Sequence, residues 1–176
     1  GGSPYFILIL LELGLVIFLS SRITKMSFMT AWISFILYSL VSGITIAAIL
    51  IAYELSSIIL MFGLTAFLFL IFGLIGYFAK IDLSKFGNIL IMMLVGILIT
   101  SLINIFLGNE TIDIIICAVG VIVFLGLVAY DVQKIKQLAY MIEDDNKLAI
   151  IGALELYLDF VNIFLYLLRL FGNSRD

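Results

Sequence analysis

Acidic side chains interrupt two apolar stretches near the carboxyl end of the chain. Asp159 lies near the middle of the stretch 148–171, with Glu155 four residues before it and Asn162 three residues after it. On a helix this spacing places the three polar side chains on one face. A charge at the centre of a bilayer costs from a few to more than about 10 kcal/mol. We therefore expect this face to point into a helix bundle or toward water.

A second aspartate, Asp131, lies near the end of the preceding apolar stretch, 112–135. Because the stretch 148–171 enters the membrane from the same side, Asp131 and Asp159 can approach each other in the inner half of the membrane. Two neighbouring carboxyl groups in a medium of low dielectric constant cannot both ionise at low cost, so one would change charge in the physiological pH range. Ionised carboxylates with Asn162 also offer the hard oxygen ligands that calcium prefers. These residue types indicate chemistry with protons, cations or both.

Simpler interpretations of the same residues stay open. Asp131 could be a carboxylate at a helix end that pairs with Lys134 or Arg22. Glu12 lies in the middle of the first apolar stretch, 4–21, and could do no more than pair with another helix. Asp159 and its neighbours could likewise serve packing alone.

The composition excludes several classes of protein. Of the 176 residues, 65% are hydrophobic and 12% are charged, whereas a soluble domain is about half apolar and a quarter charged. The net charge of −3, without a basic stretch, argues against nucleic-acid binding. With no histidine and a single cysteine, Cys117, the chain lacks obvious ligands for zinc, haem or iron–sulfur clusters and lacks histidine-dependent catalysis. We expect no cofactor, no enzymatic activity and a multi-pass location in a membrane.

Six apolar stretches are long enough to cross the hydrocarbon core, which takes about 20 residues on a helix. Strands are not expected, because no stretch alternates with period two. The connections are short, so consecutive helices should be antiparallel neighbours in one bundle. We predict an all-α, polytopic transmembrane helical bundle that forms a single domain over residues 1–176, with glycines such as Gly63, Gly76 and Gly120 permitting close helix packing. The predicted spans are 4–21, 29–51, 56–79, 86–107, 112–135 and 148–171.

Lysine and arginine are unevenly distributed among the predicted loops, and this bias predicts the orientation of the chain. The second and fourth loops, around Glu54 and at 108–113, hold no basic residue. The other three loops hold Arg22, Lys25, Lys80, Lys85, Lys134, Lys136 and Lys147. We expect these three loops in the cytoplasm and both visible ends outside. An outer start without a signal sequence is unusual, so we expect a further helix before residue 1.

Several of these segments resemble the Bax inhibitor family of membrane proteins, also called the TMBIM group. The segment ALELYLDFVNIFLYLLRLFG at 153–172 closely resembles the signature of that family's last helix. The segment AYDVQKIK at 129–136 resembles the end of its preceding helix, and VSGIT at 41–45 and LINIF at 102–106 fit its earlier helices. The resemblance covers essentially the whole chain. Because the loops are short, the chain most resembles bacterial members of the family, which implies a location in the bacterial plasma membrane.

The resemblance implies a fold of seven helices in which the last helix is central, so this chain would hold six of the seven. It also implies a pH-sensitive calcium leak across the membrane, with calcium as the transported ion. The family's paired aspartates fall on Asp131 and Asp159, which would act as the proton sensor and as possible calcium contacts. Its acid and arginine of the second helix fall on Glu12 and Arg22, at a slightly shorter spacing.

On this interpretation Arg22 is a latch that holds the aspartate pair when it is ionised. The ion path would be lined by Glu12, Glu155 and Asn162. Glu155 departs from the family pattern, which has a small or apolar residue there. A third carboxylate on this face could raise the affinity for cations or shift the pH response.

Two other functions stay open from the sequence. Some members of the family are described as modulators of membrane proteases or of cell death. A non-conducting regulator of that kind would bind a membrane-protein partner through the segment 132–147 and the termini. An intramembrane aspartyl protease would need two carboxyl groups placed for catalysis. Neither Asp131 nor Asp159 stands in a Gly-Asp motif like that of such proteases.

Overall fold

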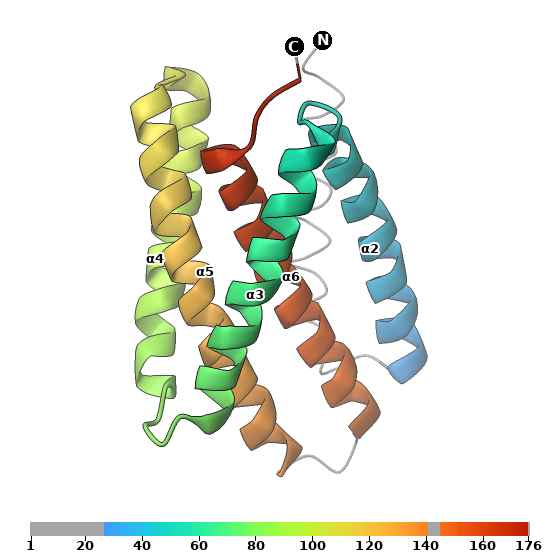
Figure 1. The fold of residues 1–176 in the computed structure, drawn as a ribbon. Coiled ribbons are helices and arrows are strands. Elements are labelled where there is room, and N and C mark those ends of the chain that lie inside the picture. Colours follow the sequence, from blue (N-terminus) through green and yellow to red (C-terminus); the bar gives the residue numbers. More distant parts are fainter. Residues whose placement is uncertain (1–26, 141–144, 176) are drawn as a thin grey trace.

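The computed structural model describes residues 27–140 and 145–175, which form one bundle of long helices (Figure 1). Within these residues the regular structure is helical, apart from an isolated β-bridge between Tyr53 and Ser174. The helices are α2 (Phe28–Leu50), α3 (Leu55–Phe78), α4 (Ser84–Leu107), α5 (Glu110–Ala139) and α6 (Asp145–Phe171). The predicted all-α class is confirmed.

All five helices are long and apolar enough to cross a membrane. They correspond to five of the six predicted spans, with bounds that agree to within a few residues. The remaining prediction, the span 4–21 with Glu12 and Arg22, lies outside the described residues. α5 continues to Ala139 because Lys136 and Gln137 favour helix and no glycine or proline stops the chain there.

The outward faces of these helices are apolar, as they must be in lipid. Leu40, Leu70, Met92 and Ile122 each expose 60% or more of their surface. A soluble protein rarely presents so much apolar surface. The chain is therefore a multi-pass membrane protein.

The two carboxyl-terminal helices form the interior of the bundle. α6 contacts α2, α3 and α5, whereas α5 contacts α3, α4 and α6. Figure 1 shows α6 between α2 and α5, with α3 crossing in front of them. The last helix is thus internal, as expected, and α5 shares this position with it. In the most apolar part of α5, 50% of the residues are buried, against 11% in the corresponding parts of α2, α3 and α4.

The close approach of α3 to α5 requires a glycine on α3. A Cβ atom on Gly76 would lie 2.1 Å from the carbonyl oxygen of Ala129. Gly120 serves the α5–α6 contact in the same way, because a Cβ atom there would lie 2.5 Å from the Tyr166 ring. By contrast, none of the described residues lies within 4 Å of a Cβ atom built on Gly63, so the packing role of that glycine stays a prediction.

The segment after α6 is hydrogen-bonded to the chain between α2 and α3 and to the first turn of α3. The backbone N–H of Glu54 donates to the carbonyl of Asn173 at 3.0 Å, and the N–H of Arg175 donates to the carbonyl of Ala52 at 2.9 Å. The N–H of Asn173 also donates to Ser57 Oγ at 3.0 Å. These hydrogen bonds attach the end of α6 to the loop between α2 and α3.

Candidate functional site

Asp131 and Asp159 come together between α5 and α6. Asp131 lies two turns before the end of α5, and Asp159 lies near the middle of α6. Their exposed fractions are 8% and 4%, and the two carboxyl groups lie within hydrogen-bonding reach of each other. The approach predicted from the order of the helices is therefore present.

The surroundings of this pair are apolar. Val128 precedes Asp131 by one helical turn, Ile163 follows Asp159 by one turn, and both side chains are fully buried. They belong to the main core cluster, which joins α5 to α6. Because low polarity disfavours charge, two ionised carboxylates cannot be held here cheaply. A proton shared between them lets each carboxyl group keep a hydrogen bond.

Two buried carboxylate oxygens have no hydrogen-bond partner among the described residues. They are Asp159 Oδ2 and Glu155 Oε2, one turn apart on α6. An unsatisfied buried polar atom costs about 1–3 kcal/mol, and more when it is charged. Such atoms are few in folded proteins and call for an explanation, such as an ion, a proton or water.

Glu155 forms an ion pair with Lys134, with 2.6 Å between Oε1 and Nζ. Both side chains are partly buried, at 25% and 35% exposure. The cation also lies 6.0 Å from the centre of the Tyr130 ring. Lys134 thus forms its ion pair with Glu155 rather than with Asp131. The other suggested partner of Asp131, Arg22, lies outside the described residues.

The polar stripe of α6 faces α5 at both of its ends. Glu155 meets Lys134 near the start of α6, and Arg169 forms an ion pair with Asp113 near its end. Asn162 behaves differently, because its amide donates to the carbonyl of Leu158 in its own helix at 2.7 Å. The structure thus brings Asp131, Asp159 and Glu155 to one region, whereas the Asn162 amide is bonded within α6.

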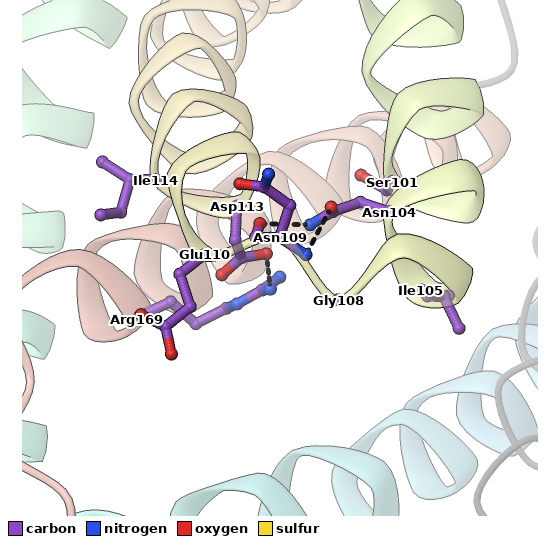
Figure 2. Close-up of a pocket in the computed structure, with 9 residues that line it drawn as sticks. All are labelled: Ser101, Asn104, Ile105, Gly108, Asn109, Glu110, Asp113, Ile114 and Arg169. Carbon is purple, nitrogen blue, oxygen red and sulfur yellow. Dashed lines mark hydrogen bonds and ion pairs between the residues drawn. The ribbon is translucent and has the colours of Figure 1, made fainter.

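A cavity of about 480 Å³ opens at the far end of the bundle, where α4, α5 and α6 meet (Figure 2). Its walls carry the Arg169–Asp113 ion pair. Asn104 closes the turn beside it by donating to the carbonyl of Asn109 at 3.1 Å and accepting from its N–H at 3.2 Å. Asp113 precedes Asp131 by 18 residues of α5, or about 27 Å at 1.5 Å per residue. This cavity is therefore separate from the aspartate pair.

Sequence reasoning missed Gln133 as a structural residue. Its side chain is 7% exposed and accepts from the N–H of Leu83 at 2.7 Å. It also donates to the carbonyl of Ile81 at 2.9 Å. These bonds tie the loop between α3 and α4 to α5, two residues beyond Asp131. The available signal was an amide inside a predicted span, where an unpaired polar group would be costly.

The loop held by Gln133 carries a carboxylate of its own. The Ser84 N–H donates to Asp82 Oδ1 at 3.0 Å. The hydrogen bonds from Ser84, with a smaller contribution from Lys85, lower the pKa of the Asp82 carboxyl. Asp82 therefore stays ionised at neutral pH. At the opposite end of the bundle, burial raises the pKa of the Tyr53 hydroxyl, which stays neutral.

No three acidic, histidine or cysteine side chains within residues 27–140 and 145–175 are close enough to hold one metal ion together. Asp131 and Asp159 are two carboxylates, and Lys134 neutralises the third. The predicted latch Arg22 and the predicted path residue Glu12 lie outside the part of the chain that the structure describes.

The sequence is similar to those of several bacterial proteins. The inner membrane protein YbhL of Escherichia coli K12 is 46% identical over 173 residues, which cover 96% of this chain and 74% of the relative. A protein of Borreliella burgdorferi described as uncharacterized is 43% identical over 173 residues, covering 96% of this chain and 75% of the relative. A Rickettsia prowazekii protein, also described as uncharacterized, is 36% identical, covering 97% and 73%.

The family described as "Inhibitor of apoptosis-promoting Bax1" matches residues 2–176, which is nearly the whole chain. This match includes α5 and α6 with the paired aspartates, and it agrees with the resemblance of the last two helices. The chain therefore belongs to the Bax inhibitor family, as a multi-pass membrane protein with a buried aspartate pair between its last two helices.

Proposed function

We propose that this protein is a pH-sensitive, calcium-permeable leak channel rather than an enzyme, gated by protonation of Asp131 and Asp159. The observation that carries the proposal is the meeting of these two buried carboxyl groups from different helices. A buried acid inside a membrane is conserved for function more often than for stability, because it is costly to keep.

Protonation would act on the α5–α6 interface. With one proton between them, Asp131 and Asp159 can hold a hydrogen bond across the interface. When both are ionised they repel each other in a region of low polarity, so the interface gains by opening or by recruiting a cation. Arg22 is the proposed cation that latches onto the ionised pair. Loss or gain of one proton would therefore shift the protein between two packings of α5 against α6.

Calcium is the proposed ion because the face carries hard oxygen donors. Asp131, Asp159 and Glu155 supply carboxylates, and Asn162 supplies an amide oxygen, with Glu12 placed on the same path. A resident ion would need more ligands at once than two carboxylates offer. Weak, transient coordination is what conduction requires, since an ion must leave as readily as it enters.

Asp82 and Tyr53, in the loops at the two ends of the bundle, do not compete as pH sensors. The pKa of Asp82 lies below its ordinary value and that of Tyr53 lies above it. Neither side chain changes charge between about pH 5 and 8. A response in that interval therefore does not come from Asp82 or Tyr53.

The test is calcium entry into dye-loaded liposomes that carry the purified protein, measured from about pH 5 to 8. Asp159→Asn and Asp131→Asn should each remove the pH dependence, because a neutral amide cannot exchange a proton. Glu110→Gln is the matched control, since Glu110 is an exposed carboxylate at the opposite end of α5. It should leave the pH profile unchanged.

Absence of flux at every pH, in folded protein, would overturn the channel proposal. The regulator hypothesis would then take its place, and the aspartate substitutions would leave partner binding intact. If both aspartate variants show calcium flux with an unchanged pH profile, the channel proposal stands but the aspartate pair is not the proton sensor.

A further inference from the structure

A neutralised lysine lies beside the aspartate pair. Lys134 follows Asp131 by three residues on α5, and Glu155 precedes Asp159 by four residues on α6. Each member of the Lys134–Glu155 ion pair is thus one helical turn from one member of the aspartate pair. The 2.6 Å contact between Nζ and Oε1 bridges the same two helices.

Geometry commits Lys134 to Glu155 rather than to the aspartates. The lysine Nζ bonds Glu155 Oε1, and Glu155 Oε2 is buried without a hydrogen-bond partner in the described part of the chain. Glu155 therefore presents a second, unused oxygen in the region that holds the orphan oxygen of Asp159. The charge of Glu155 offsets that of Lys134, so this lysine favours the ionised aspartates less than an unpaired lysine would.

Few other charges act on this region from the described elements. α5 contributes Tyr130, Asp131 and Lys134, and α6 contributes Glu155 and Asp159. The sequence of α3, which packs on α6, holds no acidic or basic residue, and its packing surface is aromatic, with Phe62 and Phe69 against Phe160. α2 brings only Tyr38 as a titratable group, against the Tyr157 ring. Among the described residues, the balance of charge around the aspartate pair therefore depends on Lys134 and Glu155.

We propose that Glu155, by neutralising Lys134, sets the pH at which the aspartate pair exchanges its proton. This inference rests on the proposed sensor role of Asp131 and Asp159 and assigns Glu155 a tuning role in addition to the ion path. Glu155 is a positioning residue here, because it acts on the aspartates through the lysine and through its own charge.

The sign of each substitution follows from charge. Glu155→Gln leaves Lys134 unneutralised beside the aspartates, which favours their ionised forms, so the midpoint of the pH profile moves to lower pH. Lys134→Gln leaves Glu155 unneutralised, which favours a protonated aspartate, so the midpoint moves to higher pH. A neighbouring charge typically moves such a midpoint by about one pH unit or more. The double variant restores the local net charge and should return close to the wild-type midpoint.

The experiment measures midpoints in two ways on the same set of proteins. The first readout is calcium flux into liposomes, and the second is the infrared carbonyl band of protonated carboxyl groups, assigned by its loss in Asp159→Asn. Lys134→Arg, which keeps the charge, is the conservative control and should leave both midpoints in place. Loss of packing alone would not move two single variants in opposite directions.

Opposite shifts of the single variants with recovery in the double variant support the inference. No shift, or shifts of the same sign, overturns it. If one single variant does not fold, the sign of the other decides. If the wild-type protein conducts no calcium, the channel proposal fails, but the infrared midpoints still test the tuning by Glu155.

Discussion

At the scale of residues, the feature that most needs explanation is a buried carboxyl group with an oxygen that lacks a hydrogen-bond partner. Asp159 occupies a site where a neutral side chain of the same shape would cost less, since its Oδ2 has no hydrogen-bond partner among the described residues. Stability is commonly lower where a site serves function. This gives a test that does not depend on transport.

Asp159→Asn should leave the protein as stable as before, or stabilise it, at about pH 8. The amide is neutral and keeps one polar contact to Asp131. The gain expected on removing an unsatisfied buried charge is about 1–3 kcal/mol. Thermal unfolding in detergent measures it, and the difference should shrink near pH 5 as the wild-type pair takes up a proton. Destabilisation of the variant at pH 8 would show that the ionised carboxylate is a structural necessity.

Gln133 illustrates a residue whose importance is structural. Gln133→Leu should destabilise the protein by about 1–3 kcal/mol, because the N–H of Leu83 and the carbonyl of Ile81 lose their hydrogen-bond partner on the buried Gln133 side chain. Faster hydrogen exchange at Leu83 would report the released loop. Gln137→Leu, four residues later on the exposed side of α5, is the matched control and should change little. Equal effects of the two substitutions would contradict the role of the hydrogen bonds.

At the scale of elements, the helices could be predicted almost completely, but their contacts could not. Hydropathy marked the five described spans to within a few residues, because lipid allows only helices or closed barrels. The helix periodicity of Glu155, Asp159 and Asn162 indicated one polar face on α6, and Glu155 and Asp159 of that face meet α5. It could not reveal that Lys134 and Asp113 of α5 are the partners at its two ends, since that depends on how the helices are rotated against each other.

The glycines show the same limit. Gly76 and Gly63 look alike in the sequence of α3, yet a Cβ atom meets the Ala129 backbone at the first and open space at the second. Gly76→Ala should push α3 away from α5. The overpacking should destabilise the bundle by about 1–3 kcal/mol or more. Gly63→Ala should be neutral or stabilising by up to about 1 kcal/mol, from helix propensity. Unfolding midpoints of the two variants, compared side by side, decide this; similar values would contradict it.

At the scale of the whole molecule, the family match and the five spans agree with what composition and motif predicted. The candidate site was predictable as a pair of aspartates, because Asp131 and Asp159 approach from the same side of the membrane. The neighbouring ion pair was not, because Lys134 could equally have reached Asp131. The orientation of the bundle stays a prediction from the lysine and arginine bias of the loops.

Cysteine labelling tests that orientation. Cys117 is 1% exposed, so the natural chain should react little with a membrane-impermeant maleimide. In intact bacterial cells, Glu110→Cys should label from outside, because the α4–α5 turn holds no basic residue. Lys80→Cys, in the loop between α3 and α4, should label only after the membrane is opened. The reverse pattern would invert the bundle and place the aspartate pair near the outer surface.

The hydrogen bonds between residues 173–175 and the loop between α2 and α3 also bear on the order of assembly. Ala52 and Glu54 leave the ribosome long before Asn173 and Arg175, so their backbone groups wait for partners until the last described residues are made. These bonds join residues about 120 positions apart, and contacts of such long range form late because loop closure must precede them. The contact between the chain after α6 and the α2–α3 loop is thus the last to form. Until then α6 is held by its packing against the other helices within the membrane.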